Sequence, residues 1–284
     1  MTKKLIALDI DGTLLTSDGR ITDENKVAIR AAQAAGHVVA VCTGRAHDAI
    51  GLLLAEEGLG DLPVSGSNGT ATVVDGQMIG CIPMNRESAL EVGDWLNGQK
   101  YGYKIYTERG VYVQRDYFAR LEADLAVAPV GKIPHSEVLA RMKRYTNRWP
   151  FIYVDGVADV PDDVKILKFY VFTPSVERKM LGMDFGRTVK GAMVTTSLPN
   201  NIEISDWEGH KGNGARALAA HFEIEMENVV VMGDNYNDTG MFEVAGLAVA
   251  MGNGEEAMKE MADVVTLSND ESGVAHAIYK YVLK

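Results

Sequence analysis

The sequence predicts an α/β protein with a parallel sheet and a smaller α+β domain inserted into the chain. Near both ends of the chain, short apolar runs alternate with helical segments, the order that parallel sheets require. The middle of the chain shows alternating, hairpin-rich segments typical of an α+β domain. A length of 284 residues with 46% hydrophobic residues is sufficient for two moderate domains.

The N-terminal segment predicts the order strand, helix, strand, helix. The apolar run Lys4–Ile10 ends at a glycine-containing turn, as a buried parallel strand does. A helix is expected over Thr22–Ala35, because a threonine can cap its start, acidic residues fill its first turn and a glycine follows its end. A strand at His37–Cys42 and a helix from about Ala46 to Glu57 follow. This order favours right-handed crossovers within one sheet.

The middle of the chain has a different pattern. Asp75 and Gly76 lie between two β-like runs within residues 63–83, which predicts a tight hairpin turn. Residues 117–163 are less periodic, and no element is assigned to them. The other elements expected here are a helix at Arg86–Gln99, strands at Tyr103–Tyr106, Val111–Gln114 and Ile166–Phe172, a helix at Ser175–Phe185, and strands at Gly191–Thr196 and Ile202–Ser205.

The parallel pattern resumes toward the C-terminus. The expected elements are a helix at Gly212–His221, a strand at Val229–Met232, a helix across Asp238–Val244, a strand at Leu247–Met251, and helices at Glu255–Met261 and Gly273–Leu283. We therefore expect one α/β core, at residues 1–83 and 200–284, split by an α+β domain at 84–199.

Charge and composition exclude several classes of function. The 28 Lys and Arg residues against 39 Asp and Glu residues give a net charge of -11, and no basic run with interleaved aromatic residues argues for nucleic acid. No stretch approaches the roughly 20 apolar residues of a membrane span. Cys42 and Cys81 lack the spacing of a zinc site, so we expect two reduced thiols. The expectation is a cytoplasmic protein of unknown oligomeric state.

Asp9 and Asp11 lie at the end of the first expected strand, on the same side of an extended chain. Ligands of open α/β sheets bind at this edge. Two close carboxylates repel each other unless they share a cation or one carries a proton, and either condition serves catalysis. Taken alone, the pair could equally be a surface turn.

A second acidic group follows another apolar strand. Asp234 and Asp238 are expected at the same sheet edge, although Asp238 can equally cap the next helix. Together with Asp9 and Asp11, Asp234 completes a set of oxygen ligands suited to Mg²⁺.

Polar residues near two other expected turns fit a phosphate ligand. Thr43 and Gly44 could bind phosphate oxygens at a helix start, or could form a simple capping turn. Lys211 could neutralise a phosphoryl group, although an isolated lysine before a helix is usually solvent-exposed. Asn68, in an Asn-Gly pair, fits a turn and a site residue equally well.

The order of these motifs resembles that of a known superfamily. LDIDGTLL at Leu8–Leu15, CTGR at Cys42–Arg45, Lys211 before a helix and GDNYND at Gly233–Asp238 resemble the four motifs of the haloacid dehalogenase superfamily. SNGT at 67–70, AMGNG at 250–254 and ADVVTLSNDESGVAHAI at 262–278 are similar to the Cof-type phosphatases of that superfamily.

The resemblance implies a Rossmann-like core, an α+β cap domain that governs specificity, and Mg²⁺-dependent hydrolysis of small phosphomonoesters, with sugar phosphates as the first expectation. It makes Asp9 the nucleophile that becomes an aspartyl-phosphate and Asp11 the general acid and base. It assigns Mg²⁺ to the side chains of Asp9 and Asp234 and the backbone carbonyl of Asp11, with Asp238 beside or behind the metal. It assigns the phosphoryl group to Ile10, Thr43, Gly44, Lys211 and Asn237, and places Asn68 near the site.

Two other functions remain open. A phosphomutase or phosphotransferase acting on sugar phosphates would share this core and cap. A non-catalytic sensor of phosphorylated metabolites is disfavoured, because degenerate relatives usually lose the nucleophile or the acid and base. Here all the charged residues of the expected site are present: Asp9, Asp11, Lys211, Asp234 and Asp238. The sequence does not identify the substrate, since the expected cap contains no readable specificity motif.

Overall fold

The computed structural model describes residues 2–128, 133–146, 151–196 and 198–283. The chain divides into two compact units, which we call the core unit (Met1–Cys81 with His210–Lys284) and the inserted unit (Ile82–Gly209). The expected return to the core at residue 200 was placed too early. The strand β11 (Asn201–Asp206) pairs with two strands of the inserted unit, so the chain re-enters the core unit only at His210.

The core unit is built on an eight-stranded, mainly parallel sheet in the order β14-β13-β12-β1-β2-β3-β4-β5. Its N-terminal elements are β1 (Leu5–Leu8), α1 (Asp23–Ala34), β2 (Val38–Cys42), α2 (His47–Glu56), β3 (Val64–Gly66), the 3-10 turn η1 (Ser67–Gly69), β4 (Ala71–Val74) and β5 (Gln77–Cys81). Its C-terminal elements are α7 (Lys211–His221), η3 (Met226–Asn228), β12 (Val229–Gly233), η4 (Tyr236–Asp238), α8 (Thr239–Phe242), β13 (Leu247–Ala250), α9 (Glu256–Met261), β14 (Val264–Val265), η5 (Asn269–Glu271), α10 (Gly273–Ala277) and a π-helical turn, η6 (Ile278–Val282).

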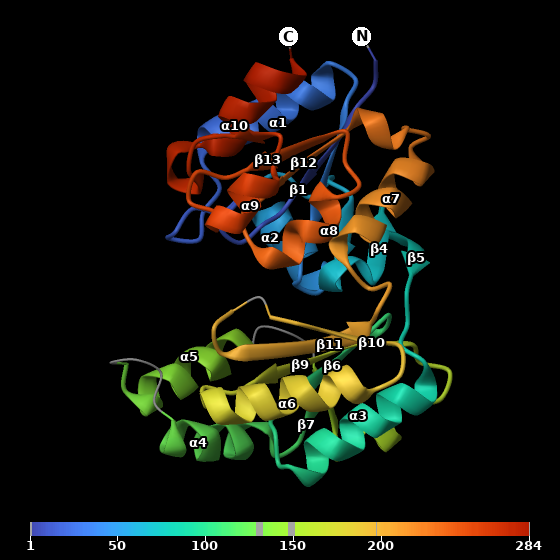
Figure 1. The fold of residues 1–284 in the computed structure, drawn as a ribbon, viewed down its shortest axis with the longest axis vertical. Helices are drawn as coiled ribbons and strands as arrows, with labels where there is room; N and C mark the ends of the chain where they lie inside the picture. Colours follow the sequence, from blue (N-terminus) through green and yellow to red (C-terminus); the bar gives the residue numbers. More distant parts are fainter. Residues whose placement is uncertain (1, 129–132, 147–150, 197, 284) are drawn as a thin grey trace. The chain divides into compact units, whose positions relative to one another are not determined.

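Helices cover both faces of this sheet because successive side chains of a strand point to opposite faces. Ile6 and Leu8 of β1 pack in the core cluster that contains residues of α1, α2 and α10. Leu5 and Ala7 pack in the cluster that contains residues of α7, α8 and α9. Figure 1 shows the resulting arrangement, with α1 and α10 on one side of the sheet and α7 and α8 on the other. The predicted α/β class is confirmed.

Local sequence explains several element boundaries. The Thr22 hydroxyl accepts a hydrogen bond from the N–H of Asn25 at 3.2 Å and begins α1 as predicted. Asp75 and Gly76, both at positive φ, form the predicted turn between β4 and β5. The last helix is shorter than expected, because the chain changes to a π-helical turn after Ala277. The strand β14 was missed, since two residues show no periodicity.

The inserted unit contains a second sheet, in the order β10-β11-β9-β6-β7-β8. Its elements are α3 (Arg86–Gly98), β6 (Tyr103–Thr107), β7 (Gly110–Gln114), α4 (Tyr117–Val127), α5 (His135–Thr146), β8 (Phe151–Val154), η2 (Val157–Asp159), β9 (Ile166–Phe172), α6 (Val176–Thr188), β10 (Ala192–Thr195) and β11. All pairs are antiparallel except β7 with β8. The helices α3 and α6 share a core with Tyr103, Phe169 and Ile202.

Residues 117–163, to which no element was assigned, include α4, α5 and β8. Two residues of β8, Ile152 and Tyr153, are exposed, so this edge strand lacks the alternation that reveals most strands. None of the helices in the described ranges is both long enough and apolar enough to span a membrane.

Candidate active site

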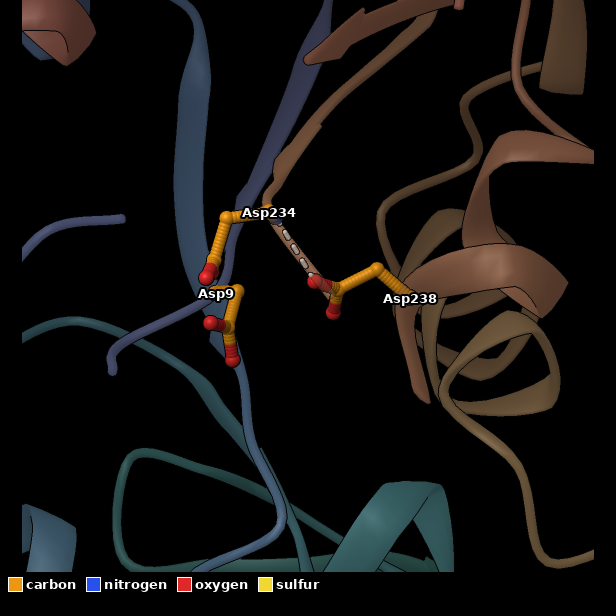
Figure 2. Close-up of side chains that lie close together, drawn as sticks. All are labelled: Asp9, Asp234 and Asp238. Carbon is orange, nitrogen blue, oxygen red and sulfur yellow. Dashed lines mark hydrogen bonds between the residues drawn. The ribbon is translucent and has the colours of Figure 1, made fainter. Parts of the chain in front are cut away.

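Three carboxylates meet at the carboxyl edge of the core sheet. The strands β1 and β12 are parallel neighbours with Leu8 opposite Met232, so the residues that follow them lie side by side. The N–H of Asp9 donates to the carbonyl of Met232 at 3.0 Å. One oxygen from each of Asp9, Asp234 and Asp238 lies within 4.8 Å of the others. Figure 2 shows the three side chains close together. The predicted meeting of Asp9 with Asp234 is confirmed.

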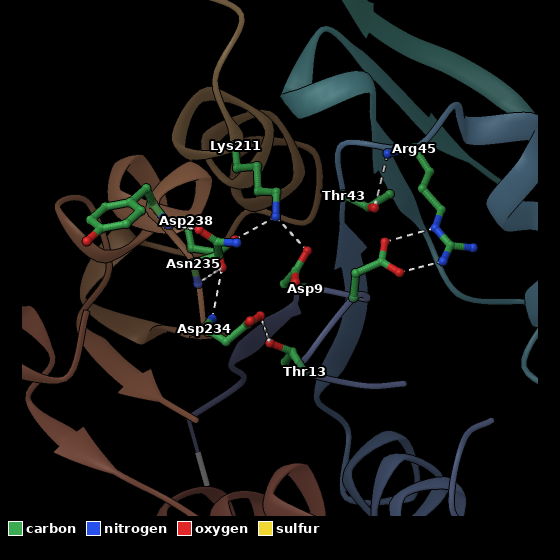
Figure 3. Close-up of polar contacts among 10 residues, drawn as sticks. Asp9, Thr13, Thr43, Arg45, Lys211, Asp234, Asn235 and Asp238 are labelled. Atoms are coloured by element: carbon green, nitrogen blue, oxygen red, sulfur yellow. Dashed lines mark hydrogen bonds and ion pairs between the residues drawn. The ribbon is translucent and has the colours of Figure 1, made fainter. Parts of the chain in front are cut away.

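Lys211 is the cation that faces this cluster. It is the first residue of α7 and is fully buried, so the solvent-exposed alternative is wrong. Its Nζ donates to Asp9 Oδ1 and to Asp238 Oδ1, each at 2.5 Å (Figure 3). Burial by itself would lower the pKa of this ammonium group, but the Asp238 and Asp9 carboxylates outweigh burial and raise the pKa. Lys211 is therefore a permanently charged partner of both carboxylates.

Asp238 stabilises the loop after β12. Its Oδ2 accepts hydrogen bonds from the backbone N–H groups of Asp234 at 2.9 Å and Asn235 at 3.1 Å. Its side chain makes no capping hydrogen bond to α8, so the helix-cap alternative is wrong. Through these contacts Asp238 fixes the backbone that carries Asp234 and also holds the Lys211 ammonium.

Asp234 is positioned by the loop that follows β1. The hydroxyl of Thr13 donates to Asp234 Oδ1 at 2.9 Å (Figure 3). Burial raises the pKa of Asp9 well above its usual range, although Lys211 acts in the opposite direction. Burial and the Asp238 carboxylate raise the pKa of Asp234 to about 6. Burial and mutual repulsion thus disfavour the ionised forms of Asp9 and Asp234, and a cation shared by the three carboxylates would relieve both effects.

Gly12 permits the close approach of these two loops. Its φ is +82°, and a Cβ added there would lie 2.3 Å from Asp234 Oδ2. We expect Gly12→Ala to lower kcat by about 100-fold or more, because displacement of a positioned group by about 1 Å has an effect of that size. Gly19 has a similar φ of +80° with no atom within 4 Å of an added Cβ, so Gly19→Ala is the matched control. Equal activity of the two variants in a phosphate-release assay would contradict this role of Gly12.

Thr43, Gly44 and Asn68 belong to two adjoining loops. The carbonyl of Thr43 accepts from the N–H of Asn68 at 2.9 Å. A Cβ added to Gly44 would lie 2.8 Å from Asn68 Oδ1 and 3.9 Å from Asn237 Nδ2, so Gly44 lies between these two side chains. Asn68 has a left-handed backbone and a buried side chain, which makes it a turn residue and a neighbour of the site. The side chain of Ile10 is in the hydrophobic core, so only backbone atoms of Ile10 could contact a ligand at this edge.

The side chain of Asp11 lies apart from the acidic cluster. The group of carboxylates close enough to share a cation contains Asp238 in addition to Asp9 and Asp234, and does not contain the Asp11 carboxylate. Both oxygens of Asp11 accept hydrogen bonds from Arg45, one from Nε at 2.8 Å and one from Nη2. The sequence interpretation gave Arg45 no role, because its partner is far away along the chain.

Two asparagines that sequence reasoning left without a role brace the loop after β1. Asn253 Nδ2 donates to the carbonyl of Gly12 at 2.8 Å, and Asn253 Oδ1 accepts from the N–H of Asn269 at 2.8 Å. Asn269 Nδ2 in turn donates to the carbonyl of Leu15 at 2.8 Å. Both asparagines fall within the motifs that resemble Cof-type phosphatases, and this resemblance was the sequence signal that could have indicated a role for them.

These features define a class of enzyme. Oxygen ligands around a buried lysine at the carboxyl edge of a parallel sheet are suited to an anionic phosphorylated ligand. The chain belongs to the haloacid dehalogenase-like hydrolases, because the model of that family matches residues 6–278. It is a phosphatase of this family that acts on small phosphomonoesters.

Individual relatives agree with this placement. Phosphatase YwpJ of Bacillus subtilis is 33% identical over 96% of this chain and 98% of its own length. The 5-amino-6-(5-phospho-D-ribitylamino)uracil phosphatase YwtE of the same organism is 31% identical over 97% of this chain and 96% of its own length. A solved structure of a haloacid dehalogenase-like hydrolase from B. subtilis is 29% identical, covers 98% of this chain and 100% of its own, and has a TM-score of 0.84.

Proposed function

We propose that this phosphatase hydrolyses sugar phosphates and related phosphorylated polyols, with Mg²⁺, through an aspartyl-phosphate on Asp9. The observation that carries the proposal is the position of Asp9, which lies at the carboxyl end of β1 with the Lys211 ammonium 2.5 Å from its Oδ1. A nucleophilic carboxylate next to a fixed positive charge can approach an anionic phosphoryl group without net repulsion.

The reaction then proceeds in two displacements. First, an Asp9 oxygen forms a bond to phosphorus while the bond from phosphorus to the alcohol oxygen breaks, and the departing oxygen takes a proton from Asp11. Second, ionised Asp11 accepts a proton from water, the water oxygen bonds to phosphorus, and the bond from phosphorus to Asp9 breaks. One residue serves as acid and then as base, so the protons balance over the cycle.

Five positions are proposed to hold the phosphoryl oxygens. They are the backbone of Ile10 and Gly44 and the side chains of Thr43, Lys211 and Asn237. The Asn237 side chain lies next to Gly44, which supports the grouping of these two positions on one side of the site. Because phosphoryl transfer depends mainly on stabilising charge on the equatorial oxygens, positive and N–H groups here lower the barrier.

The donor set fits Mg²⁺. Magnesium prefers one or two carboxylates together with water. Asp9 offers a buried carboxylate and Asp234 a half-buried one, and a cation would relieve their mutual repulsion. Both Asp238 oxygens already accept hydrogen bonds, so we place Asp238 behind the direct ligands and keep the Asp11 carbonyl as a third. When bound, Mg²⁺ would supply positive charge to the phosphoryl oxygens.

The substrate class is supported by a relative. The substrate for which YwtE is named carries its phosphoryl group on a ribityl chain, a polyol. A phosphorylated sugar or polyol is therefore our first expectation, and nucleotide and vitamin phosphates serve as the comparison group.

The test is phosphate release from a panel of sugar, polyol, nucleotide and vitamin phosphates, with Mg²⁺ and with a chelator. We expect Mg²⁺-dependent release that is fastest with the sugar and polyol phosphates. Preference for another group would overturn the substrate class, and full activity in chelator would overturn the metal. Conversion of a sugar 1-phosphate to a 6-phosphate without free phosphate would indicate a mutase, and binding without turnover a sensor.

A further inference from the structure

We propose that Arg45 is a positioning residue that aims the carboxyl group of Asp11 during proton transfer. The proposal rests on the acid and base role of Asp11 in the proposed function. Arg45 comes from the loop after β2 and Asp11 from the loop after β1, so the contact joins two of the loops that form the site.

The contact has the geometry of a paired fork. Arg45 Nε donates to Asp11 Oδ2 at 2.8 Å and Nη2 donates to Asp11 Oδ1. Two parallel hydrogen bonds from a planar guanidinium fix the plane of the carboxylate as well as its distance. Each carboxylate oxygen can accept more than one hydrogen bond, so the pair leaves Asp11 able to exchange a proton.

The backbone of Arg45 is itself fixed to the site. Its N–H donates to the Thr43 hydroxyl at 3.2 Å, and its carbonyl accepts from the N–H of Ser67 at 2.7 Å. Thr43 is buried beside Gly44, whose neighbours are Asn68 and Asn237. Arg45 therefore fixes the position of Asp11 relative to the residues proposed to bind the phosphoryl group.

Exposure indicates that the pair serves orientation more than stability. The Asp11 side chain is 56% exposed and the Arg45 side chain 31% exposed. A pair this accessible to water contributes little to folding. Without Arg45, an exposed aspartate would sample several rotamers, and few of them would place the carboxyl group at the leaving oxygen.

A comparison of two leaving groups distinguishes an effect of Arg45 on Asp11 from an effect of Arg45 on substrate binding. In the first displacement, Asp11 gives its proton to the departing alcohol oxygen as the Asp9–phosphorus bond forms. A sugar alcohol needs that proton, whereas p-nitrophenolate is a stable anion and leaves without it. A defect that acts through Asp11 must therefore be large for a sugar phosphate and small for p-nitrophenyl phosphate.

The experiment measures single-turnover release of each leaving group from wild type, Arg45→Gln, Arg45→Lys, Asp11→Asn and the double variant Arg45→Gln/Asp11→Asn. We expect Asp11→Asn to slow sugar release by about 10²- to 10⁴-fold. We expect Arg45→Gln to slow it by about 10- to 100-fold, with little change in the reactant concentration that gives half of the maximal single-turnover rate. Arg45→Lys should restore part of the rate, and the double variant should match Asp11→Asn alone.

Arg20→Lys is the control, because Arg20 also forms two hydrogen bonds to an aspartate of the core unit, and it should match wild type in rate. Thermal melts of all variants should overlap that of the control. Losses that add in the double variant, or equal losses for both substrates, would show that Arg45 acts on the substrate and would overturn the proposal. If Asp11→Asn shows no dependence on leaving group, the acid role of Asp11 fails, and the proposal for Arg45 fails with it.

Discussion

Asp9→Asn is expected to reduce phosphate release by about 10⁴-fold or more, because an amide cannot form the covalent intermediate. The substitution keeps the size of the side chain and an oxygen that can accept the hydrogen bond from Lys211. It also removes one of three clustered negative charges, so the fold should be retained. Phosphate release and a thermal melt of the same preparation measure both effects.

The matched control is Asp18→Asn, an exposed aspartate of the core unit that is outside the acidic cluster. It should leave the rate of phosphate release unchanged. An Asp9→Asn protein that turns over within about tenfold of this control would exclude nucleophilic catalysis by Asp9.

Lys211→Met is expected to lower both activity and stability. The change leaves Asp9 and Asp238 buried without their shared cation, and loss of one partner of a buried ion pair typically costs about 3–5 kcal/mol. It also removes the positive charge nearest the nucleophile, so we expect kcat to fall by about 100-fold or more. Urea unfolding and phosphate release are the measurements.

A double variant separates the two effects. Lys211→Met/Asp238→Asn also removes one of the two buried carboxylates that Lys211→Met leaves without a cation. It should therefore recover part of the lost stability but none of the activity. Lys280→Met, at an exposed position of the core unit, is the control and should resemble wild type in both measurements. Unfolding of Lys211→Met at the wild-type urea concentration would contradict the structural role of Lys211.

Much of the core fold could be predicted from the sequence, because its strands are apolar runs that end at glycine-containing turns. The helix start at Thr22 and the turn at Asp75 and Gly76 each depend on local chemistry. The second domain boundary was misplaced because strand pairing is not local. The sequence of β11 shows a strand, but only its pairing with β9 and β10 shows which sheet it joins.

The site could be predicted in its residue types but less well in its contacts. Adjacent strand ends bring Asp9 and Asp234 together, as the parallel sheet requires. The burial of Lys211 depends on two carboxylates from other elements, and no pattern around a single lysine reveals that pairing. The partner of Asp11 was missed for the same reason, since Arg45 follows a different strand.

The most direct test of the mechanism is a search for the phosphorylated intermediate. Asp11→Asn protein is mixed with p-nitrophenyl phosphate, which needs no acid for the first displacement, and is quenched in acid while the second displacement lacks its base. Mass spectrometry of the digested protein then locates the phosphoryl group. We predict one phosphoryl group on Asp9; release of p-nitrophenol with no adduct, or with the adduct on another residue, would contradict the account.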